Sequence, residues 1–70
     1  RVTAVNIEWS PAATGTYTVY VVLYRTTSTI VGYGWTSVTI STLGSTTTTV
    51  SVGAVNPADI YYVEIAIVQS

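Results

Sequence analysis

Apolar side chains alternate with polar or small ones along most of this chain, and such a period of two predicts β-strands. The longest alternation covers residues 61–68. Its first face is wholly apolar and consists of Tyr61, Val63, Ile65 and Ile67. Its second face carries one carboxylate among apolar side chains and consists of Tyr62, Glu64, Ala66 and Val68. We therefore expect a strand here with one face against a core.

Four further strands are expected at residues 3–10, 16–25, 35–42 and 46–52. Turn-forming residues separate the strands: Pro11 and the small residues after it, the step Leu43-Gly44-Ser45, and the pair Asn56-Pro57. Residues 26–34 are mostly polar and contain glycine, so we expect a loop there. Five short strands separated by turns indicate an all-β sandwich, formed by a single domain over residues 1–70.

The expected core follows from the same alternation. Strand 16–25 is apolar on both faces, which is typical of a strand covered on two sides. Within it we expect Tyr20, Val22 and Tyr24 to point inward. The complete expected core is Val5, Ile7, Trp9, Tyr20, Val22, Tyr24, Val38, Ile40, Val50, Val52, Val55, Tyr61, Val63, Ile65 and Ile67.

The amino-acid composition limits the kinds of molecule that this chain is expected to bind. A chain of 70 residues buries only about 60% of its unfolded surface, and this one has no cysteine for a disulfide. The usual remaining support is another chain. Charged residues make up 7% of the sequence and the net charge is −1, which gives no electrostatic footprint for nucleic acid or anionic lipid. No apolar run reaches the roughly 18 residues that a membrane span needs.

The sequence offers little for catalysis. A nucleophilic triad needs a histidine or an equivalent base, and the chain has no histidine. Glycosidase chemistry needs two carboxylates about 5–10 Å apart. A sandwich would place Glu8 and Glu64 on opposite sheets and the third acid, Asp59, in a turn. We therefore expect no enzyme activity, no catalytic residue, no metal ligand and no cofactor.

Abundant hydroxyl side chains, few charges and the absence of a thiol favour a secreted or cell-surface protein. Because the sequence begins at Arg1 and contains no methionine, we expect it to have been released from a precursor or cut from a larger protein. The threonine tract 46–49 is interpreted as a solvated strand start, with an O-glycosylated patch as the alternative.

Four segments together resemble the fibronectin type III domain, of the immunoglobulin-like sandwich class. Residues 5–11 resemble its strand B, residues 20–25 its strand C, and residues 35–40 its strand C′. The step Val55-X-Pro57 followed by the alternation from Tyr61 resembles the turn into its strand F. By this resemblance Tyr61 forms a tyrosine corner, with its hydroxyl bonded to backbone a few residues upstream.

The chain departs from that family at several points. It has room for neither the strand A before residue 5 nor the strand G after residue 68. Ala58-Asp59 replaces the family's Gly-Thr, the loop before Trp35 is longer, and no Arg-Gly-Asp is present, so integrin binding is not implied. Without strand G, segment 61–68 becomes an open edge, and open edges recruit another strand or aggregate.

We therefore expect a non-catalytic structural and interaction domain, a self-assembling subunit of a surface filament or a similar assembly. Its partner would be a copy of itself or another protein's strand, and the missing strands would come from a neighbour or have been trimmed away. The expected interface joins the open edge to an outward apolar patch of Val19, Val21, Leu23, Tyr62, Glu64, Ala66 and Val68. Arg25 and Glu64 either pair across two strands or are solvated separately.

The alternative function is a carbohydrate-binding or adhesion module cut from a multidomain secreted protein. Tyr33 and Trp35 lie in or beside the expected loop, and aromatic faces stack well on sugar rings. The competing interpretation is that Trp35 packs against the rim of the sandwich.

Overall fold

The computed structural model describes residues 1–70 and consists almost entirely of β-strands. The elements in chain order are β1 (Val2–Trp9), β2 (Gly15–Tyr24), β3 (Ile30–Ile40), β4 (Thr46–Val55), the 3₁₀ turn η1 (Pro57–Asp59) and β5 (Tyr62–Gln69). The prediction of an all-β chain is confirmed. Asn56 caps η1, since its side-chain oxygen accepts a hydrogen bond from the Ala58 amide.

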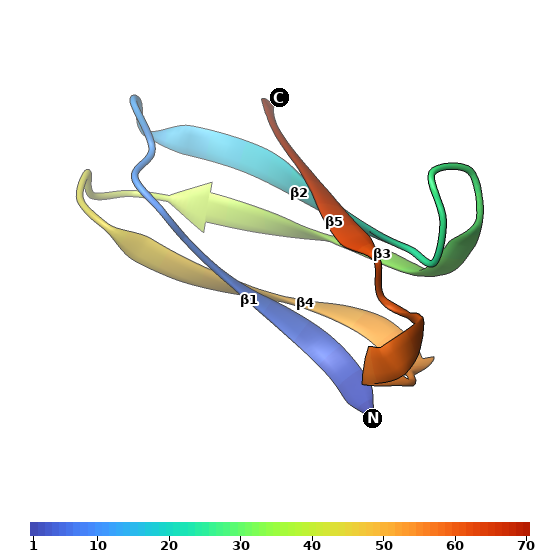
Figure 1. Ribbon diagram of the computed structural model, residues 1–70. Helices are drawn as coiled ribbons and strands as arrows, with labels where there is room; N and C mark the ends of the chain where they lie inside the picture. Colours follow the sequence, from blue (N-terminus) through green and yellow to red (C-terminus); the bar gives the residue numbers. More distant parts are fainter.

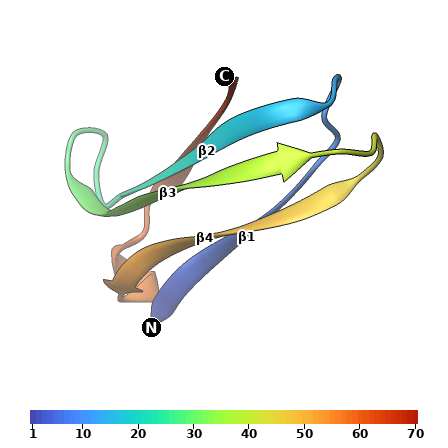
Figure 2. The same ribbon diagram turned by 180° about the vertical axis from the view of Figure 1, so that it is seen from behind.

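The strands form two antiparallel sheets. β1 pairs with β4 in a two-stranded sheet, and β2 lies between β3 and β5 in a three-stranded sheet. In Figures 1 and 2 the β3–β2–β5 sheet lies above the β1–β4 sheet, with the two termini at opposite ends of the molecule. The face of each sheet that is turned toward the other sheet is called its inner face below.

The loop predicted at residues 26–34 is confirmed for residues 26–29 and wrong for residues 30–34, because β3 already begins at Ile30. The connection from β2 to β3 is short, and the Thr26 hydroxyl holds it by accepting hydrogen bonds from the amides of Ser28 and Thr29 at 3.3 and 3.1 Å. Glycines made this segment look like a loop. In the structure they lie inside the strand, on the side that faces β4.

Gly32 and Gly34 allow β3 and β4 to approach each other closely. A Cβ atom at Gly32 would lie 3.0 Å from the carbonyl oxygen of Val52, and one at Gly34 would overlap the carbonyl oxygen of Ser51. Glycine within a strand often marks such a backbone contact. The two sheets therefore come together along the β3 and β4 side of the molecule.

The predicted orientation of β2 is wrong. Val19, Val21 and Leu23 are fully buried on its inner face, whereas Tyr20 is 44% exposed and Val22 and Tyr24 are only partly covered. Alternation could not decide the orientation because both faces of β2 are apolar. The aliphatic side chains fill the space between the sheets, and the tyrosines keep their hydroxyl groups at the surface.

Other parts of the expected core vary in their burial. Ile7, Ile40, Val50, Val52 and Val55 are buried, and Val5, Trp9, Val38 and Ile67 are partly buried against them. Three residues expected inside are instead exposed: Tyr61, Val63 and Ile65. Val63 and Ile65 belong to β5, which the opposing sheet does not cover, and Tyr61 lies in the connection before β5.

The tyrosine corner expected at Tyr61 is wrong, because this side chain is exposed and its hydroxyl makes no hydrogen bond. A bond of the expected kind occurs at Tyr17 instead. The buried Tyr17 donates its hydroxyl proton to the carbonyl oxygen of Ala13, four residues upstream, at 2.6 Å. The Tyr17 ring also packs edge-on against Trp9, with centroids 5.1 Å apart.

Two matched substitutions on β2 test its orientation. Val21→Ala should lower the free energy of unfolding by about 2 kcal/mol, because it leaves a cavity in the core. Val22→Ala should lower it by less than about 1 kcal/mol, because this side chain lies on the outer face. Chemical denaturation of both variants checks the difference, and a larger loss for Val22→Ala would contradict the structure.

Candidate functional site

The outer edge of β5 has no strand beside it. β5 bonds to β2 alone, as β3 does, and β1 and β4 bond only to each other, so each sheet has two edges. The edges of β3 and β4 lie where the two sheets come together, whereas those of β5 and β1 lie away from this contact. The amide of Ser70 donates to the carbonyl oxygen of Thr16 at 2.9 Å, which fixes the alternation of backbone groups along the antiparallel ladder. Even-numbered residues of β5 direct these groups to β2. The amides and carbonyls of Val63, Ile65 and Ile67 therefore point to the free edge.

An apolar row follows the same edge on the inner face. Val63, Ile65 and Ile67 lie opposite Leu23, Val21 and Val19, the most deeply buried residues of β2. Nevertheless Val63 is 43% and Ile65 46% exposed. The two-stranded β1–β4 sheet is too narrow to cover β5 as well as β2 and β3. This row, Val63 to Ile67 on the inner face of β5, is called the open row below.

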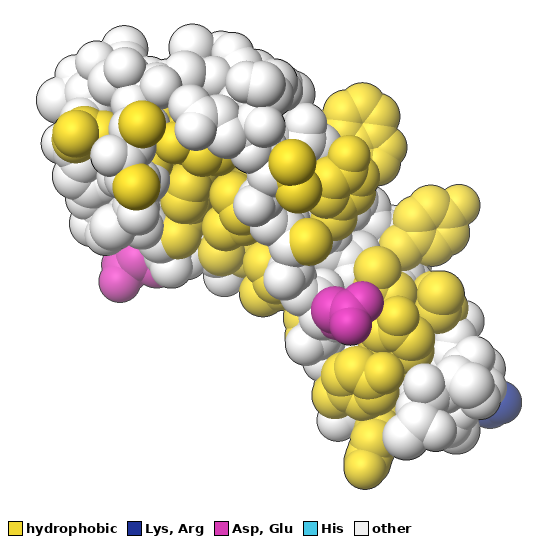
Figure 3. Space-filling view, turned by 90° about the horizontal axis from the view of Figure 1, so that it is seen from above, with side chains coloured by type: hydrophobic (Ala, Val, Ile, Leu, Met, Phe, Trp, Pro, Cys, Tyr) yellow, Lys and Arg dark blue, Asp and Glu magenta, His cyan; other side chains and the backbone are white.

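The outer face of the three-stranded sheet is also apolar, and much of it is aromatic. The register places Tyr20 between Trp35 and Ala66, and Val22 between Tyr33 and Glu64. Figure 3 views the molecule from the side of this sheet and shows hydrophobic side chains gathered along it, with few charged groups. We call this surface the aromatic face; it consists of Tyr20, Val22, Tyr24, Tyr33, Trp35, Tyr62, Ala66 and Val68.

Four of the predicted interface residues lie on the outer face of the three-stranded sheet, and they are Tyr62, Glu64, Ala66 and Val68. Val19, Val21 and Leu23 do not, because they form the core. Sequence reasoning missed Tyr20, Val22 and Tyr24 as surface residues. The preference of tyrosine for keeping its hydroxyl hydrated was the available signal.

Tyr33 and Trp35 lie two residues apart on β3 and both face outward, 72% and 64% exposed. The interpretation that Trp35 packs against the rim is therefore wrong. Tyr20 lies directly opposite Trp35 on the neighbouring strand. Three aromatic rings thus stand together on one surface that is open to solvent.

At the end of the aromatic face, Tyr24 and Tyr62 stack in parallel with ring centroids 4.5 Å apart. The Tyr24 hydroxyl donates to Oε1 of Glu64 at 3.3 Å. Arg25 and Glu64 form no ion pair in the structure, so these two charges are not paired across the strands. Partial burial, followed by the negative charge of Glu64, raises the pKa of Tyr24 above its ordinary value.

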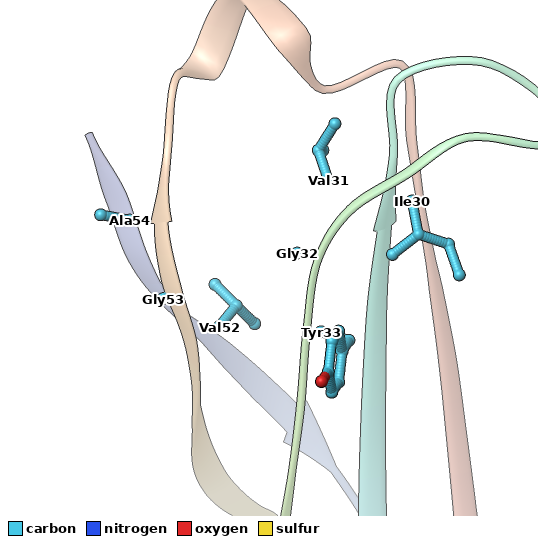
Figure 4. Close-up of a pocket in the computed structure, with 7 residues that line it drawn as sticks. All are labelled: Ile30, Val31, Gly32, Tyr33, Val52, Gly53 and Ala54. Atoms are coloured by element: carbon cyan, nitrogen blue, oxygen red, sulfur yellow. The ribbon is translucent and has the colours of Figure 1, made fainter.

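A shallow cavity of about 420 Å³ lies between the start of β3 and the end of β4. Its lining is mostly aliphatic and glycine: Ile30, Val31, Gly32, Tyr33, Val52, Gly53 and Ala54. In Figure 4 Val31 and Val52 lie between the two strands, whereas the Ala54 methyl group points away. The cavity offers apolar contact and backbone groups, with the Tyr33 phenol as its one titratable side chain.

No group of three or more acidic, histidine or cysteine side chains is placed to hold a metal ion. None of the helical structure is long and apolar enough to cross a membrane. No family model, curated protein or solved structure matches the chain.

The Tyr24–Glu64 contact predicts a pH dependence. Because the folded-state pKa of Tyr24 is raised, the contact stabilises the fold fully below the ordinary tyrosine pKa of about 10 and loses this effect as the pH rises through the raised value. Glu64→Gln should lower the Tyr24 pKa, and Glu8→Gln on the other sheet should not. An NMR titration of the Tyr24 ring carbon measures both. Equal effects of the two substitutions would contradict the assignment.

Proposed function

We propose that this chain is a non-catalytic, extracellular structural and interaction domain that assembles with copies of itself. The proposal rests on one observation above all: the open row is exposed on the inner face of a sheet whose edge has free hydrogen-bonding groups. A neighbouring strand on β5 would pair these groups and cover apolar side chains at once. Filaments and closed oligomers can both be built from such contacts.

The size of the apolar surface supports an interface. A patch of about 400 Å² is within the range of the largest patches on monomers, which are often functional. Covering it would contribute roughly 10 kcal/mol before the costs of association. This is comparable to the whole stability of a small domain. A surface of this size would therefore favour association with a partner.

The strand order supports a fibronectin type III-like sandwich as the finer fold assignment. In that reading β1 and β4 correspond to strands B and E, and β3, β2 and β5 correspond to strands C′, C and F. The two absent strands, A and G, would then flank β1 and β5. These are the two edge strands that lie away from the contact between β3 and β4.

A charge on the open row should block assembly. Ile65→Lys introduces an ammonium group at an exposed position of the β5 edge, and lysine is a residue that natural edge strands use against pairing. We expect oligomers of the wild-type chain at micromolar concentration and monomers of this variant. Thr47→Lys, on the outer face of β4, adds the same charge and should leave assembly unchanged. Multi-angle light scattering measures all three, and a monomeric wild-type chain would refute the proposal.

Carbohydrate binding is a second candidate, which the three exposed rings of Tyr20, Tyr33 and Trp35 favour. A flat arrangement of aromatic side chains on a sheet offers apolar faces on which sugar rings can stack. Serine and threonine side chains of the same strands, such as Ser37, provide hydroxyl groups nearby.

Tryptophan fluorescence tests this second candidate. In Trp9→Phe the only remaining indole is Trp35, so oligosaccharide binding on the aromatic face should give a saturable shift of its emission. Tyr33→Ala in the same background should weaken binding, because it removes one aromatic surface on which a sugar ring can stack. Thr39→Ala, further along β3, is the matched control. An emission spectrum that does not change with added oligosaccharide would dismiss this function.

A further inference from the structure

The free edge of β5 is suited to a particular partner, namely the same strand of a second copy. We propose that two copies pair β5 with β5 in antiparallel orientation, with Ile65 opposite Ile65. The pairing would join two three-stranded sheets into one continuous sheet across a two-fold axis. This inference rests on the proposed self-assembly and specifies its contact and register.

The backbone restricts the possible registers. Only odd-numbered residues of β5 have amide and carbonyl groups free at the edge, as the Ser70–Thr16 bond and the ladder register establish. In a continuous antiparallel sheet, directly opposite residues also share a face. Odd residues must therefore lie opposite odd residues, and even residues opposite even ones. Any register that shifts one copy by a single residue would turn the open row of that copy to the wrong face.

Side-chain contacts across the two strands favour one of the registers that remain. Shifting the pairing so that Glu64 lies opposite Glu64 would bring two carboxylates together, and like charges directly opposite are destabilising. Shifting it the other way, with Ala66 opposite Ala66, would place Val63 against the polar Gln69. The register centred on Ile65 avoids both faults. Its directly opposed pairs are Ile65 with Ile65, Val63 with Ile67, Glu64 with Ala66, and Tyr62 with Val68.

β5 is better suited to strand pairing than β1, the other edge strand that lies away from the contact between β3 and β4. β1 has an irregularity in its register between Val2 and Ala4, and bulges of this kind disrupt further pairing. β5 pairs with β2 without a register shift from Tyr62 to Gln69. The chain contains no lysine, and β5 contains no proline, so two common means of protecting an edge are absent from it.

The inference also accounts for the exposure of the open row. Val63 and Ile65 are nearly half exposed because nothing within one chain lies beside or over them. In the paired arrangement each side chain of this row gains an aliphatic neighbour from the second copy. The stacked pair Tyr24 and Tyr62 lies at the end of the contact, where Tyr62 would meet Val68 of the other copy.

Disulfide trapping tests the register directly, because the native chain has no cysteine. Under mild oxidation Ile65→Cys should form covalent dimers at least about tenfold faster than Thr47→Cys, which reports random collision. The Cα atoms of a hydrogen-bonded pair lie about 5.5 Å apart, within the range of natural disulfides.

Because Ile65→Cys also removes a side chain that would pack in the contact, a double variant at the neighbouring positions provides an independent test of the register. Glu64→Cys and Ala66→Cys should each dimerise slowly alone, and together they should dimerise fast, because position 64 lies opposite position 66. If Glu64→Cys or Ala66→Cys alone were the fastest, the register would be overturned while self-assembly stood. If no variant exceeded Thr47→Cys although light scattering shows oligomers, pairing through β5 would be overturned. A chain that stays monomeric would overturn both this inference and the proposed function.

Discussion

The structure depends on covering the inner face of β2, where Val19, Val21 and Leu23 are fully buried. The β1–β4 sheet covers this strand together with β3, and the close approach at Gly34 brings the two sheets together on that side. The two strands of the β1–β4 sheet cannot also cover β5, the third strand of the opposing sheet. β5 therefore extends the inner face beyond the reach of the opposing sheet, and Val63 and Ile65 are left nearly half exposed.

This single constraint connects the fold to the proposed function. A sheet edge and an apolar row coincide on β5, so one added strand would satisfy the hydrogen-bonding groups and the side chains together. The aromatic face is a separate surface on the opposite side of the same sheet. A ligand or a further copy bound to this face would not compete for the edge of β5.

Much of the fold could be predicted from the sequence, because alternation identifies strands and prolines and glycines mark their ends. The orientation of β2 could not, since its two faces are equally apolar and only the tyrosine hydroxyl groups distinguish them. The start of β3 was missed because Gly32 and Gly34 look like loop residues until β4 lies against them. The exposure of Ile65 depends on how many strands the other sheet has, and alternation carries no information about that number.

The open edge is the central claim, and amide hydrogen exchange along β5 measures it residue by residue. In dilute solution the amides of Val63, Ile65 and Ile67 should exchange rapidly, while those of Glu64 and Ala66 are protected by β2. Raising the protein concentration should protect the first set as copies associate. Odd-numbered amides that are already protected in the monomer, or that stay unprotected in the assembled state, would contradict the account.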